Sequence, residues 1–479
     1  MGTAGATRVL ILDGTREPSP ELVGGKAAGI ARMTAAGLPV PPAFVLTTDV
    51  CREFLVHGES VLDAVSDEIS RGMAHLERST GRGFGSAESP LLVSVRSGAA
   101  RSMPGMMDTA LNLGTTPDVL KALSEARGRE YAEDVRTRFE RLFREVVPGG
   151  VVPEDPWAQL RLAVAAVFRS WLSPRAVAYR RRYGLDDAAG TAVTVQAMVF
   201  GNADAASGTG VLFTRDPATG AAEPYGEWLG RAQGEDVVSG ERAPLPLGAL
   251  AEALPQVHAQ LMEYGRRLEE QQRDVQDIEF TVESGRLWLL QTRSAKRSPL
   301  AAVRFAVALA REGLISRGEA VARVSDEQLR AVLRPGLDPA ARRAAPLLAQ
   351  GLPASPGVGT GVVVTAPDEA ENRAEREPVV LARHTTSPHD LHGMIAAAAI
   401  VTEVGGATSH AAVVSRELGV PCVVGCGEGA LAGLAGEVVT VCGETGEVRE
   451  GVVPVVAISE ADDEDLRLLR EWATATAEQ

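Results

Sequence analysis

Apolar residues follow two different spacings in the first half of the chain. In residues 130–146 they recur at positions i, i+4, i+8, i+11 and i+12, which places them on one face of a helix. In residues 91–98 they form a short run that ends in polar residues and a glycine, as buried strands do. The spacings predict a mixed α/β region over residues 1–115 and a helical region over residues 117–185.

Strand patterns return after the helical region. Apolar runs at 191–201 and 209–216 flank a stretch rich in Gly, Asn, Asp and Ser. Two alternating runs within 278–292 surround a Ser-Gly pair, which is the pattern of a β-hairpin. Two helical patterns and a Pro-rich stretch then occupy residues 300–356, which we interpret as a helical linker.

The last part of the chain predicts a second, compact α/β unit. Short valine-rich strands alternate with turns through residues 357–455, and a clear helical pattern covers residues 410–418. Residues 456–479 are acidic and then helical in pattern. We therefore expect four parts, which are residues 1–299, the linker 300–356, the second unit and the acidic C-terminal helix.

Length and composition narrow the class of protein. The 479 residues correspond to roughly three domains of ~150 residues each. The formal net charge of −15 disfavours a general binder of nucleic acid or of anionic membranes. Four cysteines are too few for a disulfide framework in so long a chain. The sequence contains no long apolar span and no secretory pattern at its start, so we expect a cytoplasmic protein.

The segment 405–425 carries the strongest candidate chemistry. A pair of glycines at its start allows a tight turn, and Thr408 or Ser409 can cap the helix that follows. His410 then lies in the first helical turn, where free N–H groups and the helix dipole stabilise an anion. A neutral imidazole there can attack phosphorus and hold the transferred group against those donors. From the spacing alone, an ordinary histidine at a helix start explains the pattern equally well.

The same segment resembles the phosphohistidine motif of the phosphoenolpyruvate-utilising enzymes, in which a mobile domain carries a phosphorylated histidine. TSPHDLHGM at 386–394 is similar to the Thr-Ser-Pro-x-Asp segment that precedes this motif in the family. The resemblance implies that His410 is the phosphorylated residue and makes Thr408 a candidate regulatory residue. It does not extend to position 404, where Val404 stands in place of the arginine usual in the family.

Three neighbouring histidines, His384, His389 and His392, offer a competing interpretation as a metal cluster. They fall on a predicted loop and early helix, and no cysteine or carboxylate lies at zinc-ligand spacing from them. We therefore favour the phosphohistidine interpretation of this region.

Other segments resemble the dikinase branch of that family, in the same order along the chain. These segments are 23–48, 94–114, 195–220, 230–240 and 276–298. The resemblance covers about residues 20–455. It implies an ATP-grasp nucleotide-binding domain over residues 1–299, with a helical insertion at about 117–185, followed by a swivelling phosphohistidine domain over 357–455.

The resemblance also implies that ATP is a substrate. Lys26 and Arg96 would supply positive charge to its polyphosphate. Gln196 and Met198 lie where the strand of the family meets the adenine edge.

The segment 201–210, with Gly208 and Gly210, is expected to be a flexible loop whose N–H groups close over the phosphates. Such a segment is by itself weak evidence and is usually a hairpin tip.

The predicted hairpin and the residues beside it carry a candidate site for magnesium and phosphate. Asp277 and Glu279 alternate onto one face of a strand, and Gln291 is expected to face them from the paired strand. We expect Glu279 and Gln291 to hold Mg²⁺ together with the substrate phosphates, and Arg293 to reach a phosphate. For two alternating carboxylates alone, a solvated sheet face is the more common explanation.

The segment 102–109 resembles the dikinase version of the family, which sends the γ-phosphoryl group of ATP to inorganic phosphate. Gly105 could admit the phosphate ion, with Arg96 and Arg101 offsetting its charge. The alternative is a plain loop whose methionines pack on the sheet. The related synthase branch instead sends the γ-phosphoryl group to water.

The expected function is ATP- and phosphate-dependent phosphorylation of His410, a phosphotransferase reaction that yields AMP and pyrophosphate. The family's dikinases have a C-terminal barrel that binds pyruvate, and such a barrel needs ~250 residues. Residues 456–479 are too few for one, so we expect the acceptor, pyruvate or another small molecule, on a separate barrel protein. The alternatives are a water-using small-molecule or antibiotic phosphotransferase and a non-catalytic nucleotide sensor. A homodimer is compatible with the sequence.

Overall fold

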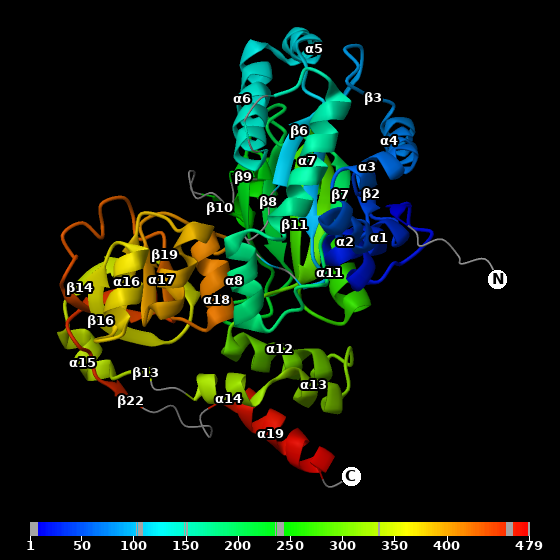
Figure 1. Ribbon diagram of the computed structural model, residues 1–479. Coiled ribbons are helices and arrows are strands. Elements are labelled where there is room, and N and C mark those ends of the chain that lie inside the picture. The colour runs from blue at the N-terminus through cyan, green and yellow to red at the C-terminus, as the bar shows by residue number, and fades with distance from the viewer. Residues whose placement is uncertain are drawn as a thin grey trace. The chain divides into compact units, whose positions relative to one another are not determined.

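The computed structural model describes residues 8–101, 103, 109–147, 149, 152–234, 236, 244–333, 336–456 and 463–477 (Figure 1). The chain divides into two compact units, which we describe one at a time. The first contains Met1–Gly208 and Phe280–Arg293, and the second contains Thr209–Glu279 and Ser294–Gln479. Both units combine helices with sheets, which confirms the predicted α/β multidomain class. Within the part of the chain that the structure describes, no helix is long and apolar enough to cross a membrane.

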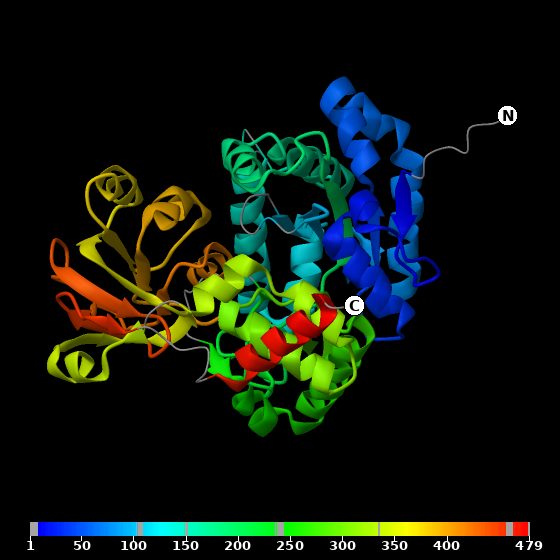
Figure 2. The same cartoon turned by 90° about the horizontal axis from the view of Figure 1, so that it is seen from below.

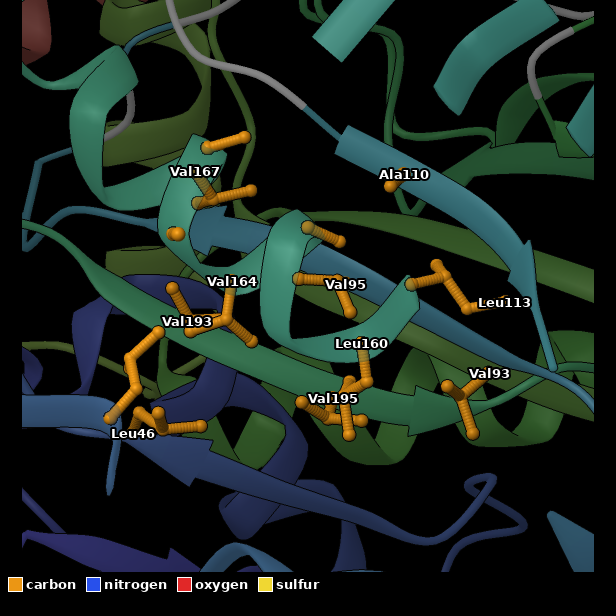
Figure 3. Close-up of a cluster of buried hydrophobic side chains, with 14 of the residues drawn as sticks. Leu46, Val93, Val95, Ala110, Leu113, Leu160, Val164, Val167, Val193 and Val195 are labelled. Atoms are coloured by element: carbon orange, nitrogen blue, oxygen red, sulfur yellow. The ribbon is translucent and has the colours of Figure 1, made fainter. Parts of the chain in front are cut away.

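An antiparallel five-stranded sheet in the order β1-β2-β7-β5-β6 forms the centre of the first unit. Its strands are β1 (Val9–Ile11), β2 (Ala43–Leu46), β7 (Ala192–Ala197), β5 (Val93–Gly98) and β6 (Thr109–Leu113). Valines alternate along β5 and β7 and form one apolar face, against which helix α7 (Pro156–Ser170) packs Leu160 and Val164 (Figure 3). Asp155 caps α7 by accepting a hydrogen bond of 2.8 Å from Ala158 N.

Helix α1 (Pro20–Ala35) bends at Gly24, where φ is 77°. A Cβ at Gly24 would lie 2.1 Å from Gly98 O, so the close approach of α1 to the end of β5 requires glycine. The other helices and strands of the first unit are α2 (Thr48–His57), α3 (Ser60–Ala64), α4 (Ser66–Thr80), β3 (Gly83–Phe84), β4 (Pro90–Leu91), α5 (Pro117–Arg127), α6 (Arg129–Val146) and α8 (Pro174–Tyr183).

A second five-stranded sheet has the order β10-β9-β8-β11-β12. Its strands are β10 (Leu245–Pro246), β9 (Tyr225–Gly230), β8 (Gly208–Phe213), β11 (Gln276–Glu283) and β12 (Arg286–Ser294). The hairpin predicted within 278–292 is confirmed as β11 and β12. Its turn residues Ser284 and Gly285 have φ of 50° and 78°, as tight hairpin turns require. Helices α10 (Leu247–Ala253) and α11 (Pro255–Gln272) belong to the second unit.

Four helices of the second unit lie together (Figure 2). They share one cluster of buried apolar side chains. They are α12 (Pro299–Arg311), α13 (Arg317–Arg323), α14 (Asp326–Val332) and α19 (Glu464–Ala477). The first three lie in the segment predicted as a linker, and α19 corresponds to the predicted C-terminal helix. A large part of residues 300–356 is therefore a packed helical body.

The C-terminal sheet has eight strands in the order β14-β21-β20-β16-β17-β18-β19-β15, and its four strands from β16 to β19 are parallel. Its strands are β14 (Leu347–Gln350), β15 (Leu352–Ser355), β16 (Val358–Val364), β17 (Val379–Arg383), β18 (Ala399–Thr402), β19 (Cys422–Val424), β20 (Val438–Cys442) and β21 (Glu447–Glu450). Helices α16 (Pro367–Ala374), α17 (Leu391–Ala396) and α18 (His410–Leu418) cover one face. The strands and the helix predicted within 357–455 are confirmed.

Two short elements before β14, a strand and a helix, contact the C-terminal part of the chain. Strand β13 (Gly336–Leu337) pairs with β22 (Val455–Val456). Helix α15 (Pro339–Ala344) follows, and Arg342 Nε donates a hydrogen bond of 2.8 Å to Glu447 Oε2 of β21. The second half of the predicted linker therefore packs with the sheet that follows it.

Candidate active site

His410 begins α18 close to the carboxyl end of a parallel strand. After β18 ends, residues 403–409 lead into the helix, and Ser409 caps it by accepting a hydrogen bond of 3.4 Å from Ala412 N. The neighbouring parallel strand β17 leads into residues 384–390 at the same end of the sheet. Ligands of α/β proteins bind at the carboxyl ends of parallel strands, so this position suits a reactive group.

The His410 ring is largely buried, and burial lowers its pKa to about 4. The negative charge of Asp390 opposes this shift because it favours the imidazolium form. Atom Nδ1 lies 3.2 Å from Thr386 Oγ1, whereas Nε2 is buried with no hydrogen-bond partner among the described residues. The ring is therefore neutral at pH 7, as a nitrogen nucleophile must be.

Glu227 of β9 contacts the turn that precedes α18. Its carboxylate accepts a hydrogen bond of 2.7 Å from Ala407 N and a second one from Thr408 Oγ1. A Cβ at Gly406 would lie 2.1 Å from Glu227 Oε1, so the approach of this buried carboxylate requires glycine. The sequence allowed either Thr408 or Ser409 to cap α18. In the structure Ser409 caps the helix, and Thr408 contacts Glu227 instead.

The side chain of Arg416 in α18 holds the same turn by donating a hydrogen bond to a backbone carbonyl group of that turn. Its NH2 donates to Ala407 O at 2.8 Å and its NH1 donates to Ala354 O at 3.0 Å. The guanidinium carbon lies 6.0 Å from the centroid of the Phe213 ring. Complete burial lowers the pKa of Arg416, and the charge of Asp277 opposes that shift. A buried arginine and a buried glutamate therefore both determine the shape of the turn before His410.

Glu227 and Arg416 are functional-site residues that the sequence alone did not indicate. Glu227 lies in a short strand with Trp228 and Leu229, and its partners are about 180 residues away in the sequence (|i−j| is 180 for Ala407). The available signal was a charged residue within an apolar strand, which is uncommon unless the charge has a partner. Arg416 is similar, since it occupies a buried position of an amphipathic helix.

We expect Gly406→Ala and Glu227→Ala each to lower the free energy of unfolding by about 1–3 kcal/mol. The first introduces a methyl group against the carboxylate, and the second leaves Ala407 N–H and the Thr408 hydroxyl without their acceptor. The double variant should lose less than the sum of the two, by about 1 kcal/mol, because the clash is then absent. Urea unfolding of all four proteins measures this coupling.

Gly248→Ala is a matched control for the Gly406 substitution. Gly248 lies in helix α10, and a Cβ there meets no atom within 4 Å. That variant should be at least as stable as the wild type. Additive losses in the Gly406 and Glu227 variants would contradict the proposed contact.

The stability of the protein should depend on pH through His410. Its folded pKa of about 4 lies below the ordinary value of 6.5, so at intermediate pH the unfolded chain binds a proton that the folded chain does not. The free energy of unfolding should therefore fall as the pH falls from about 6.5 to about 4, by up to about 3 kcal/mol from this group. His410→Gln should remove this part of the pH dependence in urea unfolding, whereas His57→Gln at an exposed position should not.

The structure places Lys26 and Arg96 in the same unit, near one end of β5. Lys26 follows the bend of α1, and Gly25 N donates to Ala99 O at 2.9 Å. A Cβ at Gly98 would lie 3.9 Å from Lys26 Cβ, and Arg96 lies two residues earlier in β5. The two cations predicted to contact polyphosphate thus belong to adjoining elements, and their role stays a prediction.

Gln196 and Met198 lie at and just beyond the end of β7. The buried Gln196 side chain donates a hydrogen bond of 3.1 Å from Nε2 to Pro41 O, so its amide helps to hold the chain before β2. Met198 N donates to Leu92 O at 2.9 Å, and its side chain packs against a cluster that includes Phe200. The predicted contact of these residues with adenine is untested.

The expectation of a flexible loop at 201–210 is wrong for Gly208 and Gly210, which both lie in strand β8 and are buried. The preceding turn is held by Asp204, whose carboxylate accepts a hydrogen bond of 2.7 Å from Ser207 Oγ. Glycine weakens a strand interior and so favours a loop, but both positions belong to the strand. Their contact with nucleotide stays a prediction.

Asp277 and Glu279 lie two residues apart in β11, and Gln291 and Arg293 lie two residues apart in β12, so each pair shares a face of its strand. The Asp277 and Gln291 side chains are buried. Two carboxylates and an amide oxygen are the kind of ligand that Mg²⁺ prefers, together with phosphate oxygens and water. The residues present therefore fit a magnesium ion in chemical type.

The histidines near His410 contact two separate carboxylates. His384 Nδ1 lies 3.0 Å from Glu403 Oε2, and His392 Nε2 lies 2.8 Å from Asp368 Oδ1. Within the described ranges, no group of three or more His, Cys, Asp or Glu side chains could hold a metal ion. His384 and His392 are thus each paired with a single carboxylate.

The predicted phosphate site is described only in part. The guanidinium carbon of Arg101 lies 5.7 Å from the centroid of the Tyr183 ring of α8. Gly105 lies outside the described residues. The phosphate-binding role of both residues stays a prediction.

Comparison with known families identifies two regions of the chain. Residues 20–80 and 62–246 match the family model described as pyruvate phosphate dikinase, AMP/ATP-binding domain. Residues 375–446 match the family model described as PEP-utilising enzyme, mobile domain. His410 lies inside the second region, and Lys26, Arg96, Gln196 and Met198 lie inside the first.

Individual relatives match nearly the whole chain. The pyruvate, phosphate dikinase of Rhizobium meliloti (strain 1021) is 40% identical over 97% of this chain and 59% of its own length. The enzyme of the same name from Clostridium symbiosum is 40% identical over 90% of this chain and 56% of its own length. That from Entamoeba histolytica is 41% identical over 92% of this chain and 57% of its own length. The chain thus spans less than two thirds of the length of these curated relatives.

Proposed function

The chain belongs to the pyruvate phosphate dikinase family, and we propose on that premise that it transfers the β-phosphoryl group of ATP to His410 in a reaction that consumes inorganic phosphate. The observation that supports this most directly is the state of His410. Its ring is neutral because burial lowers its pKa to about 4, and it lies at the N-terminus of α18. Backbone N–H groups and the helix dipole at that end stabilise the transferred phosphoryl group.

The proposed reaction breaks two bonds of ATP. A lone pair of the His410 ring forms an N–P bond to the β-phosphorus, and the bond from that phosphorus to the α,β-bridging oxygen breaks with AMP as the leaving group. An oxygen of inorganic phosphate forms a bond to the γ-phosphorus, and the β,γ-bridging bond breaks to release pyrophosphate. The products are AMP, pyrophosphate and phosphohistidine at residue 410.

Basic and acidic residues of the nucleotide-binding region have separate tasks in this proposal. Lys26 and Arg96 bind the polyphosphate and offset its charge. Glu279 and Gln291 would hold Mg²⁺, with Asp277 nearby in sequence on the same strand face. The bound ion would neutralise charge on the phosphate oxygens. Arg293 adds a further cation in β12.

The second half-reaction requires an acceptor. The names of the relatives indicate pyruvate and phosphate as substrates of those proteins. We propose pyruvate, or another small molecule, as the acceptor of the phosphoryl group on His410. Delivery would require movement of the C-terminal sheet, whose two connections to the four-helix cluster both pass through the paired strands β13 and β22.

The fate of the γ-phosphoryl group distinguishes two reactions. If phosphate is the acceptor, incubation with ATP and ³²P-labelled phosphate should give labelled pyrophosphate. We expect Arg101→Ala to raise the phosphate concentration needed for half-maximal rate by about tenfold or more, because one charge-assisted hydrogen bond is worth about 1.5–3 kcal/mol. Arg71→Ala, at an exposed position of α4, is the matched control. Release of AMP with unlabelled phosphate alone would instead indicate transfer to water.

A further inference from the structure

The two nitrogens of the His410 ring have different surroundings. Nδ1 lies 3.2 Å from the hydroxyl oxygen of Thr386, a hydrogen-bonding distance. Nε2 is buried, and no described residue offers it a hydrogen bond. The Thr386 hydroxyl can accept a hydrogen bond from Nδ1–H or donate one to an unprotonated Nδ1, so this contact and the surroundings of Nε2 together determine the tautomer.

The two neutral tautomers differ in what they leave buried. If Nε2 carries the proton, its N–H is a buried donor without an acceptor among the described residues. If Nδ1 carries the proton, Nδ1–H donates to Thr386 Oγ1, and Nε2 keeps a lone pair. Buried N–H donors without acceptors are rarer in proteins than acceptors without donors. The surroundings of the ring therefore favour the Nδ1–H tautomer.

The position of Thr386 is determined by a buried carboxylate. Asp390 Oδ2 accepts a hydrogen bond of 2.6 Å from Ser387 N and one of 3.2 Å from Ser387 Oγ, which closes the turn that follows Thr386. Arg383 NH2 lies 3.3 Å from Asp390 Oδ1, and Arg383 NH1 donates to Thr365 O at 2.9 Å. The side chain of Asp390 is 6% exposed. The end of β17 and the start of α17 thus hold the Thr386 hydroxyl beside the ring.

We infer that Thr386 is a positioning residue that holds His410 as the Nδ1–H tautomer, and that Asp390 maintains the turn on which Thr386 lies. The catalytic consequence of this tautomer rests on the proposed function. With the proton on Nδ1, the lone pair of Nε2 is the nucleophile that forms the N–P bond. The ring becomes positively charged during the attack, and its Nδ1–H remains hydrogen-bonded to Thr386 Oγ1. The proton therefore needs no transfer before the phosphorus is attacked.

The tautomer can be measured without any reaction. In the full chain labelled with ¹⁵N-histidine, the ¹⁵N shifts and two-bond couplings of each ring report which nitrogen carries the proton, and His410→Gln identifies the signals among the seven histidines. At neutral pH we expect the wild-type ring as Nδ1–H. Thr386→Val should shift it toward Nε2–H, the form that free neutral histidine prefers, and Thr386→Ser should restore Nδ1–H. A wild-type ring in the Nε2–H form would overturn the inference even if no variant folds.

Kinetics provide the second measurement. Thr386→Val should slow formation of phosphohistidine by about 10- to 100-fold with ATP binding unchanged, by analogy with the loss of hydrogen-bond partners that orient metal-ligating histidines. Thr386→Ser should recover most of the rate. Thr360→Val is the matched control, because it removes a hydroxyl that bonds to Thr440 Oγ1 at 2.9 Å in the same sheet. It should leave tautomer and rate unchanged.

The two proposals fail in different ways. If the wild type shows the Nδ1–H tautomer that Thr386→Val abolishes but never forms phosphohistidine, the proposed function is wrong and the positioning role stands. If the wild type is phosphorylated and Thr386→Val changes neither tautomer nor rate, the positioning role is wrong and the proposed function stands.

Discussion

His410→Ala is expected to reduce phosphorylation of the protein to background when it is incubated with β-³²P-labelled ATP, Mg²⁺ and phosphate. Loss of a covalent nucleophile lowers the rate by on the order of 10⁶ in well-studied enzymes, far beyond the effect of any neighbouring substitution. The wild-type label should be labile in acid and stable in base, as a phosphorus–nitrogen bond is. ATP binding, measured by calorimetry, should persist in the variant.

His389→Ala is the matched control for this result. His389 lies in the short helix that precedes α17, and the phosphohistidine interpretation assigns it no role. Its variant should be labelled like the wild type. Persistent labelling of His410→Ala, or loss of label in His389→Ala alone, would remove residue 410 from the mechanism.

Glu279→Ala and Gln291→Ala should each lower Mg²⁺-dependent ATP turnover by about 10²-fold or more, because each would lose an oxygen ligand of an ion that clamps the phosphates. The loss should be partly offset at high Mg²⁺ concentration, which a purely structural role does not explain. The measurement is AMP formation as a function of Mg²⁺ concentration, with circular dichroism to verify folding.

Glu283→Gln tests whether any carboxylate of β11 would give the same loss. Glu283 lies four residues after Glu279, on the same face of β11. Its carboxylate forms an ion pair with Arg127 at 2.9 Å. Its substitution should weaken that ion pair and leave the Mg²⁺ dependence unchanged. Near-normal turnover of Glu279→Ala or Gln291→Ala would show that the ligand assignment is wrong.

The C-terminal sheet and α18 were predictable because their signals are local. Apolar runs bounded by turn residues predict its short strands. After the paired glycines, apolar residues recur at helical spacing up to Leu418, and Gly419 ends the helix in the left-handed conformation. The position of His410 at the helix start follows from the same pattern. Local periodicity was sufficient to place the candidate nucleophile.

The contacts that shape the turn before His410 could not be predicted in the same way. Glu227 and Thr408 are distant in sequence, and nothing in the local pattern of either residue indicates the other. The choice of Ser409 over Thr408 as helix cap depends on that contact, because the Thr408 hydroxyl is already hydrogen-bonded to the carboxylate. Gly208 and Gly210 show the opposite error, since a local signal for a loop was outweighed by their place in a sheet.

The pairing of β13 with β22 has a mechanical consequence. The chain passes between the four-helix cluster and the C-terminal sheet twice, once after α14 and once before α19, and both passages start from these two paired strands. A body attached by one segment can spin about it, whereas rotation of a body attached by two adjacent segments winds them around each other and shortens their reach. For the movement of the sheet proposed above, the strand pair therefore favours bending across the pair over rotation about a single segment. In the proposed movement, the face of the sheet that α18 covers, with His410 at the start of that helix, would therefore keep its direction while the sheet bends back and forth.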